Sequence, residues 1–430
     1  MEHLKVPAPS DAEDRTTLAA RVTELLDRLR TGGESAVREL SREFDRWDPE
    51  DFRVADAEVE RAADELSDEV KESIAFAQEQ VRDFARLQRA TLTDLEVETR
   101  PGVILGHRHV PVSSVGCYVP GGRYTLIASS YMSIIPARVA GVDRVVVSTP
   151  PMGGRVPPGV LYSAHLAGAD AVYSIGGVQA LAAMAYGLLP GLEPVDMVVG
   201  PGNAYVVEAK RQIFGDVGID LLAGPTEIGI VADDSADPFI VACDLVGQLE
   251  HDPRSRGVLI TTSRELGQAV IDQMDAHLSA VPTEPIARAA WEHGGEVIVV
   301  ADEQELIEVS DRYAMEHIEV LMRQPERMLD RLTHYGSLFI GEETTVAYGD
   351  KVAGTNHVLP THRAARFTGG LWVGKFLKTV TYQRMDRNGS LEMAHHCDVE
   401  ATAEGMMAHA RTARVRTERY APAGASPQPG

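Results

Sequence analysis

The sequence predicts an α/β fold with two α/β units in tandem, a helical N-terminal segment and a mostly helical C-terminal tail. Its 430 residues exceed the length that one hydrophobic core normally supports, so two major domains are expected. Short β-rich runs alternate with helical stretches over most of the chain, which is typical of a parallel sheet covered by helices. The proportions of hydrophobic residues, 44%, and charged residues, 24%, are ordinary for a globular protein.

The N-terminal segment, residues 12–90, has apolar residues at intervals of three and four, which predicts amphipathic helices. The pattern is clearest in ESAVRELSREFDRW and VKESIAFAQEQVRDFARLQRA. The first residues of the chain are acidic and contain no apolar core, so no signal peptide is expected. No apolar stretch approaches the roughly 18 residues of a membrane span, and we therefore expect a cytoplasmic protein.

Two series of strands and helices follow from about residue 113. The first contains the strand candidates VSSVGCYVP, VDRVVVSTP, ADAVYSIGG and VDMVVG. The second begins with the strand TEIGIVADD and the helix DPFIVACDLVGQLEHD, and continues with the strands GVLITTS, EVIVVADE, HIEVLM and GSLFIGEE. After about residue 370 the strand pattern fades, so helices are expected as far as Arg419, followed by a disordered Pro/Gly/Ala/Ser-rich end.

Charge and cysteine content narrow the classes of partner. A formal net charge of -23 argues against nucleic acid or an anionic membrane surface, because either would repel the chain. The three cysteines, Cys117, Cys243 and Cys397, are too few and too scattered for a disulfide framework or a CxxC metal site. A bound metal would therefore take His, carboxylate or amide ligands.

Three glycine-rich turns each follow a predicted strand and precede a helix. They begin at Tyr118 (YVPGG), Gly176 (GGVQ) and Gly200 (GPGN). Such turns let backbone N–H groups face a phosphate or nucleotide. None has the GxGxxG dinucleotide fingerprint, and glycine also occurs in such turns for conformational reasons alone, so both interpretations stay open.

Several polar residues could form a metal site. Gln248 and His251 are three apart on a predicted helix and would share one face, although for this segment taken alone a solvated helix end is the favoured explanation. Asp350 and His357 lie in a glycine-punctuated loop, and His409 lies in the helical tail. Together Gln248, His251, Asp350 and His409 offer nitrogen and oxygen donors suited to zinc.

Glu316 and His317 precede the apolar run IEVLM and so lie at the mouth of a predicted strand, where α/β enzymes carry their chemistry. An adjacent carboxylate and imidazole supply the acid/base pair that proton transfer needs. A surface Glu-His dipeptide is the alternative explanation.

In the order in which they occur, these motifs resemble those of the histidinol dehydrogenase family, from about residue 15 to 420. The motifs that carry the resemblance are GCYVPGG, GGVQALAAMAYG, VGPGNAYVVEAKRQIFGDVGIDLLAGPTE, DLVGQLEHDP, DRYAMEHIEV, GDKVAGTNHVLPT and AEGMMAHARTARVR.

The resemblance implies two tandem Rossmann-like domains without GxGxxG and a small helical C-terminal domain. It also implies a homodimer in which the C-terminal domain completes the partner's site. The implied domains are residues 12–117 with 233–370 (first α/β domain, including the N-terminal helices), 118–232 (second, NAD-binding), 371–420 (dimer-completing) and 421–430 (a disordered tail). The implied NAD contacts are Tyr118, Gln179 and Asn203.

The resemblance also implies the chemistry of the site. Gln248, His251, Asp350 and His409 match the zinc ligands, and Glu316 and His317 match the catalytic pair. An alcohol would be oxidised through an aldehyde to a carboxylate, each step passing a hydride to NAD; His317 would take the hydroxyl proton and Glu316 would activate water. The implied substrate contacts are Thr226, Gln248, His251, His317, Asp350, Glu404 and His409.

Details of the sequence favour the sulfopropanediol dehydrogenase branch of this family over histidinol oxidation. Thr226 stands where serine is usual, and Arg123 lies in the turn GCYVPGGRY. The branch implies oxidation of 2,3-dihydroxypropane-1-sulfonate to sulfolactate, and Arg123 could provide the arginine fork that a sulfonate needs. Alternatively, Arg123 contacts the NAD pyrophosphate or solvent.

Two other functions stay open on the sequence. The first is oxidation of L-histidinol to L-histidine. The second is a catalytically silent, metal-binding paralogue, which the presence of Glu316, His317 and every implied ligand disfavours.

Overall fold

The computed structural model describes residues 1–9 and 15–421, which fall into two compact units. Unit 1 comprises residues 1–89 and 112–376, and unit 2 comprises residues 90–111 and 377–430. The predicted disordered tail, 421–430, lies outside the described residues except for residue 421. No helix of the described ranges has both the length and the apolar character needed to cross a membrane.

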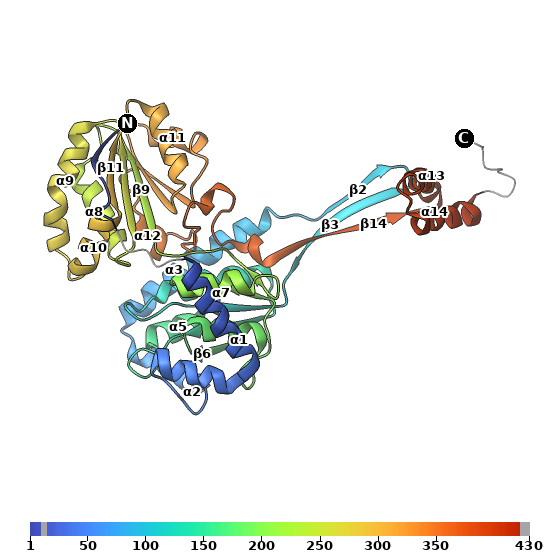
Figure 1. The fold of residues 1–430 in the computed structure, drawn as a ribbon, viewed down its shortest axis with the longest axis horizontal. Coiled ribbons are helices and arrows are strands. Elements are labelled where there is room, and N and C mark those ends of the chain that lie inside the picture. Colours follow the sequence, from blue (N-terminus) through green and yellow to red (C-terminus); the bar gives the residue numbers. More distant parts are fainter. Residues whose placement is uncertain (10–14, 422–430) are drawn as a thin grey trace. The chain divides into compact units, whose positions relative to one another are not determined.

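Unit 1 contains a five-stranded, fully parallel sheet in the order β6-β5-β4-β7-β8. Its edge strand β6 is labelled in Figure 1. Numbered along the chain this is the order 3-2-1-4-5 of a Rossmann sheet. Helices cover both faces, so the central strands are almost wholly apolar. The elements are β4 (Ser114–Tyr118), α4 (Ile127–Ala140), β5 (Arg144–Thr149), α5 (Pro158–Ala167), β6 (Ala171–Ser174), α6 (Gly177–Tyr186), β7 (Met197–Val199), α7 (Ala204–Ile213) and β8 (Gly218–Ile219).

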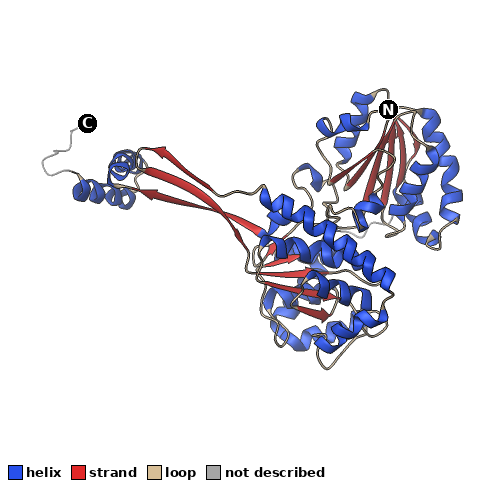
Figure 2. Ribbon diagram, turned by 180° about the vertical axis from the view of Figure 1, so that it is seen from behind, coloured by secondary structure: helices blue, strands red, loops and turns tan. Residues whose placement is uncertain are grey.

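A six-stranded sheet in unit 1 has the order β1-β11-β10-β9-β12-β13. Apart from β1, which runs antiparallel at the edge, it repeats the Rossmann order. Helices again line both faces (Figure 2). Its elements are β1 (Glu2–Lys5), β9 (Glu227–Ala232), α8 (Pro238–Leu249), β10 (Arg256–Thr261), α9 (Arg264–Ser279), α10 (Glu284–Gly294), β11 (Gly295–Val299), α11 (Glu303–Tyr313), β12 (His317–Leu321), β13 (Ser337–Ile340) and α12 (Val346–Lys351).

The N-terminal helices are α1 (Arg15–Leu40), α2 (Asp56–Ala62) and α3 (Asp68–Ala90). The predicted grouping of these helices with residues 233–370 is wrong. Helix α1 contacts α6 and α7, and α2 contacts α5, so both cover the five-stranded sheet. Val22, Leu26 and Leu29 of α1 belong to the core of that sheet.

Two further predicted boundaries are corrected. Strand β4 lies in the five-stranded sheet, so the expected boundary at residue 117 cuts through a strand. Strand β9, which was expected in the domain 118–232, is central to the six-stranded sheet.

Unit 2 is not purely helical, which corrects the predicted helical domain 371–420. It contains an antiparallel sheet in the order β14-β3-β2 in addition to two helices that pack on each other. Residues 90–111, expected in the first domain, supply two of its strands. The elements are β2 (Leu95–Arg100), β3 (Val103–Pro111), β14 (Leu377–Met385), α13 (Arg387–Ala403) and α14 (Met407–Tyr420).

Candidate active site

The candidate site in unit 1 involves the point in each Rossmann sheet where the strand order reverses. In the five-stranded sheet, the turns after β4 and β7 lie at the carboxyl ends of the strands, as expected for a ligand site. In the six-stranded sheet, Thr226 precedes β9 and Glu316 precedes β12. Glu316 and His317 thus lie at the start of β12, as the sequence predicted. This is the amino end of the strand, whereas ligands of α/β enzymes usually bind at the carboxyl ends.

A cavity of about 250 Å³ is lined by residues from the turns of the five-stranded sheet and from the amino ends of strands in the six-stranded sheet. It includes eight of the positions discussed from the sequence, together with backbone of the turns at Gly121 and Gly202. Those positions are Arg123, Asn203, Thr226, His251, Glu316, His317, Asp350 and His357.

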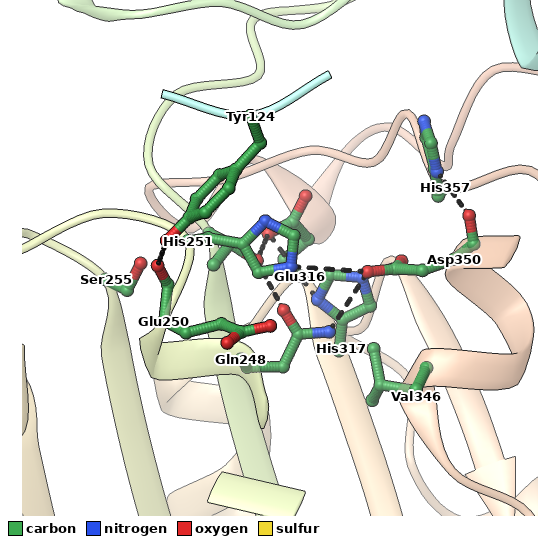
Figure 3. A network of polar contacts seen from close by, with 12 residues as sticks. Tyr124, Gln248, Glu250, His251, Ser255, Glu316, His317, Val346, Asp350 and His357 are labelled. Atoms are coloured by element: carbon green, nitrogen blue, oxygen red, sulfur yellow. Dashed lines mark hydrogen bonds and ion pairs between the residues drawn. The ribbon is translucent and has the colours of Figure 1, made fainter. Parts of the chain in front are cut away.

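The Asp350 carboxylate is the centre of the polar contacts (Figure 3). Its Oδ2 lies 3.3 Å from Gln248 Nε2 and 3.7 Å from His251 Nε2, and its Oδ1 lies 3.7 Å from His317 Nε2. Burial alone would raise the pKa of Asp350, but the close contact and charge of His317, with the neighbouring histidines His357 and His251, hold it well below its usual range. Asp350 is therefore a buried carboxylate.

Glu316 and His317 are both buried, with 5% and 3% exposure. Oε2 of Glu316 accepts hydrogen bonds from Thr226 Oγ1 at 2.8 Å and from the Glu227 N–H at 3.0 Å. Burial raises the pKa of Glu316 to about 7, which suits a group that exchanges a proton near neutral pH. Burial opposes protonation of His317, yet the Glu316 and Asp350 carboxylates raise its pKa to about 9.

The position of the His317 ring is fixed by one contact. Nδ1 lies 3.1 Å from the Glu227 carbonyl oxygen, which makes Nδ1 the protonated nitrogen that donates to it. Nε2 is buried without a hydrogen-bond partner among the described residues and faces Asp350. An unpartnered buried nitrogen indicates a position that a ligand or substrate satisfies.

Gln248 and His251 do not share a helix face as predicted. Helix α8 ends at Leu249, one residue after the buried Gln248, and His251 follows in the bend beyond the helix. The His251 N–H still bonds to the Gln248 carbonyl at 3.3 Å, so the turn keeps the two side chains near Asp350. Burial lowers the pKa of His251, which favours the neutral imidazole that binds metals.

The residues of unit 1 can bind zinc only if the side-chain amide of Gln248 is one of the ligands. No group of three His, Cys, Asp or Glu side chains in residues 1–9 and 15–421 is arranged to hold a metal ion. Beside His251 and Asp350, the third donor must be the Gln248 amide oxygen, which now lies 3.4 Å from Thr226 Oγ1. An amide flip exchanges Oε1 with Nε2 and so turns the oxygen toward Asp350 without moving any other residue, so the donor set fits zinc.

The three predicted NAD contacts differ in accessibility. Asn203 lines the cavity and caps α7, its Oδ1 accepting from the Tyr205 and Val206 N–H groups. Tyr118 and Gln179 do not line it and are buried, with 4% and 1% exposure. Tyr118 Oη accepts from the Gly177 N–H at 3.2 Å, so Tyr118 supports the GGVQ turn.

Glu404 and His409 belong to unit 2, where Glu404 is the C-cap of α13 and His409 lies in α14. Both are exposed, and the contacts around Asp350 include neither. Their predicted roles stay predictions.

Three supporting residues were missed from the sequence. Asp45 accepts from the Gly176 N–H and from Gln179 Nε2, at 3.2 and 3.0 Å. Ser129 Oγ lies 3.2 Å from Nε2 of His357, whose Nδ1 lies 2.9 Å from the Asp350 carbonyl. Only three-dimensional contact reveals them, because no local pattern marks these side chains.

Glu319, the third missed residue, lies beneath the site on β12 and is fully buried. Its Oε1 accepts from the Val346 N–H at 2.8 Å, at the start of the helix that carries Asp350. Burial, with the charge of Asp244, raises the pKa of Glu319 from its usual 4.5 to about 8. Glu319 is therefore protonated in the fold at neutral pH.

Glu319→Gln, which resembles the protonated acid, should make stability less dependent on pH. Because the folded pKa is raised, the contribution of Glu319 is complete below its unfolded pKa near 4.5 and is lost as pH rises through about 8. Wild type should thus lose stability relative to Glu319→Gln between about pH 5 and pH 9, measured by urea unfolding. The exposed Glu72→Gln substitution is the control, and a constant difference across this range would contradict the assignment.

Comparison with known proteins decides the family. The family model described as histidinol dehydrogenase matches residues 9–417. The chain belongs to the histidinol dehydrogenase family. The predicted enzyme class, an NAD-dependent oxidoreductase acting on CH–OH groups, is confirmed with it.

Relatives within this family carry different names. A histidinol dehydrogenase homolog from Shouchella clausii is 53% identical over 93% of this chain and 94% of its own length. The sulfopropanediol 3-dehydrogenase of Ruegeria pomeroyi is 45% identical over 98% of this chain and 97% of its own. The crystal structure of histidinol dehydrogenase from Elizabethkingia anophelis has a TM-score of 0.89 at 32% identity, covering 96% of this chain and 94% of that chain.

Proposed function

We propose that this protein oxidises 2,3-dihydroxypropane-1-sulfonate to sulfolactate in two NAD-dependent steps at a zinc site. The observation that carries the proposal is the charge of the cavity. Beside the buried Glu316–His317 pair, it presents the exposed cations Arg123 and Lys351, which suit a permanently anionic substrate, whereas the third cation, Arg254, is paired with Asp252 at 3.0 Å. The 45% identity to a sulfopropanediol 3-dehydrogenase supports it.

The roles of the chain's own residues follow from their contacts. His317 would take the hydroxyl proton at Nε2, because Nδ1 is committed to the Glu227 carbonyl. Nε2 can accept a proton only when the ring is neutral, and zinc bound to Asp350 would favour the neutral ring by offsetting the carboxylate charge that raises the pKa of His317. Glu316, whose pKa is about 7, then takes a proton from the water that attacks the aldehyde. Thr226 orients Glu316 through its 2.8 Å hydrogen bond.

Gln248, His251 and Asp350 would hold zinc in unit 1, and the turn at Asn203 would hold NAD, with Tyr118 and Gln179 in the supporting turns. When bound, zinc polarises the alcohol oxygen and NAD accepts the hydride. Tetrahedral zinc needs a further donor, and we assign it to His409.

We further propose that His409 and Glu404 reach the site of a second chain in a homodimer. Two facts support this. Both residues are exposed in unit 2, and the described unit 1 site supplies only three of the assigned ligands. A dimer that exchanges small units in this way satisfies two-fold symmetry, because each chain gives and receives one.

Histidinol is the rival substrate. A histidinol dehydrogenase of Cereibacter sphaeroides is 42% identical over 95% of this chain, close to the value for the sulfopropanediol enzyme. Histidinol has a cationic amino group, which the exposed Arg123 and Lys351 of the cavity would repel. Rates of NADH formation with each alcohol decide between them: we expect turnover of the sulfonate, whereas turnover of histidinol alone would overturn the proposal.

Arg123→Ala should raise KM for the sulfonate. Arg123 has no hydrogen-bond or ion-pair partner among the described residues, so its guanidinium is available to an anion. Loss of a charge-assisted contact predicts an increase in KM of about 10-fold or more, with kcat nearly unchanged. Arg155→Ala, which removes an exposed arginine outside this cavity, is the matched control.

The NAD titration of Arg123→Ala separates the remaining alternatives. An increase in KM for NAD alone would assign Arg123 to the pyrophosphate. If neither KM for the sulfonate nor KM for NAD changes, Arg123 lies in solvent and does not bind the sulfonate.

A further inference from the structure

The buried ion pair between Lys210 and Asp220 lies under the turn that follows β7. Lys210, on α7, is 1% exposed, and the Asp220 side chain is completely buried. The reaction assigned above uses neither residue. A buried ion pair seldom adds stability compared with apolar side chains of the same size, so another reason for its presence is needed.

Both charges of the pair bind the same residue. Lys210 Nζ donates to the Gly200 carbonyl at 2.8 Å, and Asp220 Oδ2 accepts from the Gly200 N–H at 2.8 Å. Asp220 Oδ1 completes the ring by binding Lys210 Nζ. The two backbone polar groups of Gly200 are thus both held from one side of the chain.

The opposite side of Gly200 is also closed. Its φ of +118° lies in the region that favours glycine, and a Cβ there would collide with the carbonyl of Tyr118 at the end of β4. Gly200 therefore fits between β4 and the ion pair in one orientation. This is the point where the order of the strands reverses and where a Rossmann sheet receives its dinucleotide.

The orientation of Gly200 sets the course of the next residues. Pro201, Gly202 and Asn203 line the cavity directly after it. Oδ1 of Asn203 is committed to the cap of α7, so its amide NH₂ is the part left for a ligand. A rotation at Gly200 would displace all three residues together.

We infer that Lys210 and Asp220 are positioning residues for the dinucleotide: they hold the Gly200 turn in its binding conformation without touching the ligand. This inference rests on the proposed function, because it takes the turn at Asn203 to bind NAD. It predicts an effect on dinucleotide affinity that is separate from alcohol binding and from metal content.

The test measures NADH binding to the zinc-loaded protein by fluorescence titration. In Lys210→Met/Asp220→Asn no unpaired charge is left buried and an acceptor for the Gly200 N–H is kept, but the donor to the Gly200 carbonyl is lost. We expect Kd for NADH to rise about tenfold, with zinc content and KM for the alcohol unchanged. Val270→Ala, a fully buried truncation in the six-stranded sheet region, controls for general destabilisation.

The outcomes are distinguishable. An unchanged Kd in the folded double variant would overturn the inference while leaving the proposed function intact. Failure of wild type to bind NADH would overturn both. If the Met variant does not fold, Lys210→Gln/Asp220→Asn keeps a polar donor that is too short for the Gly200 carbonyl, and the same increase in Kd is required of it.

Discussion

Glu316→Gln should lower kcat by about 10²- to 10⁴-fold, the usual contribution of a general base. The substitution keeps the size of a buried side chain held by Thr226 and the Glu227 N–H, so the site should stay assembled. Because Glu316 is assigned to the water-dependent step, the first oxidation should continue and the aldehyde should accumulate. His317→Asn should instead slow the first oxidation by a similar factor.

Single-turnover NADH formation measures the two steps separately. Glu296→Gln is the matched control, since Glu296 is a buried glutamate of β11 outside the cavity, bonded to Tyr313. Equal loss of both steps in Glu316→Gln, or full retention of aldehyde oxidation, would contradict the division of roles.

Mixing two inactive variants should restore activity if active sites are shared between chains. His251→Ala removes a ligand in unit 1, and His409→Ala removes the ligand assigned to unit 2. Each variant alone should lose its zinc and nearly all activity. After unfolding and refolding together in equal amounts, half of the dimers are mixed and each has one intact site, so about a quarter of wild-type activity should return.

A site completed within one chain predicts no recovery, because every chain then carries one defect. His395→Ala in place of His409→Ala is the control for the mixing experiment, since His395 is an exposed histidine of α13 with no assigned role.

Short apolar runs that alternate with helical stretches were sufficient to predict both parallel sheets, because strands buried on both faces are apolar along nearly their whole length. The sheet of unit 2 could not be predicted in this way. Strand β14 is exposed at nearly every position and β2 at all six, so neither has a buried face that would produce a pattern. The partner of the N-terminal helices was missed for a related reason, since periodicity identifies the buried face of α1 but not what covers it.

The candidate site could also be predicted only in part. The side chains of Gln248 and His251 indicated a metal site, and that of Glu316 indicated acid/base chemistry. Their convergence on Asp350, 102 residues after Gln248, depends on the packing of α8, β12 and α12. The general rule that α/β enzymes bind ligands at the carboxyl ends of strands does not extend to this pair, since Thr226 and Glu316 lie at the amino ends of β9 and β12.

The central claim is oxidation of an anionic diol through to the carboxylate, and the most direct measurement is the end point of NADH formation. Zinc-loaded protein, excess NAD and limiting 2,3-dihydroxypropane-1-sulfonate should give about two NADH per diol, with sulfolactate as product, because each oxidation passes one hydride. One NADH per diol would contradict the second oxidation. No NADH from the diol, with two from histidinol, would contradict the proposed substrate.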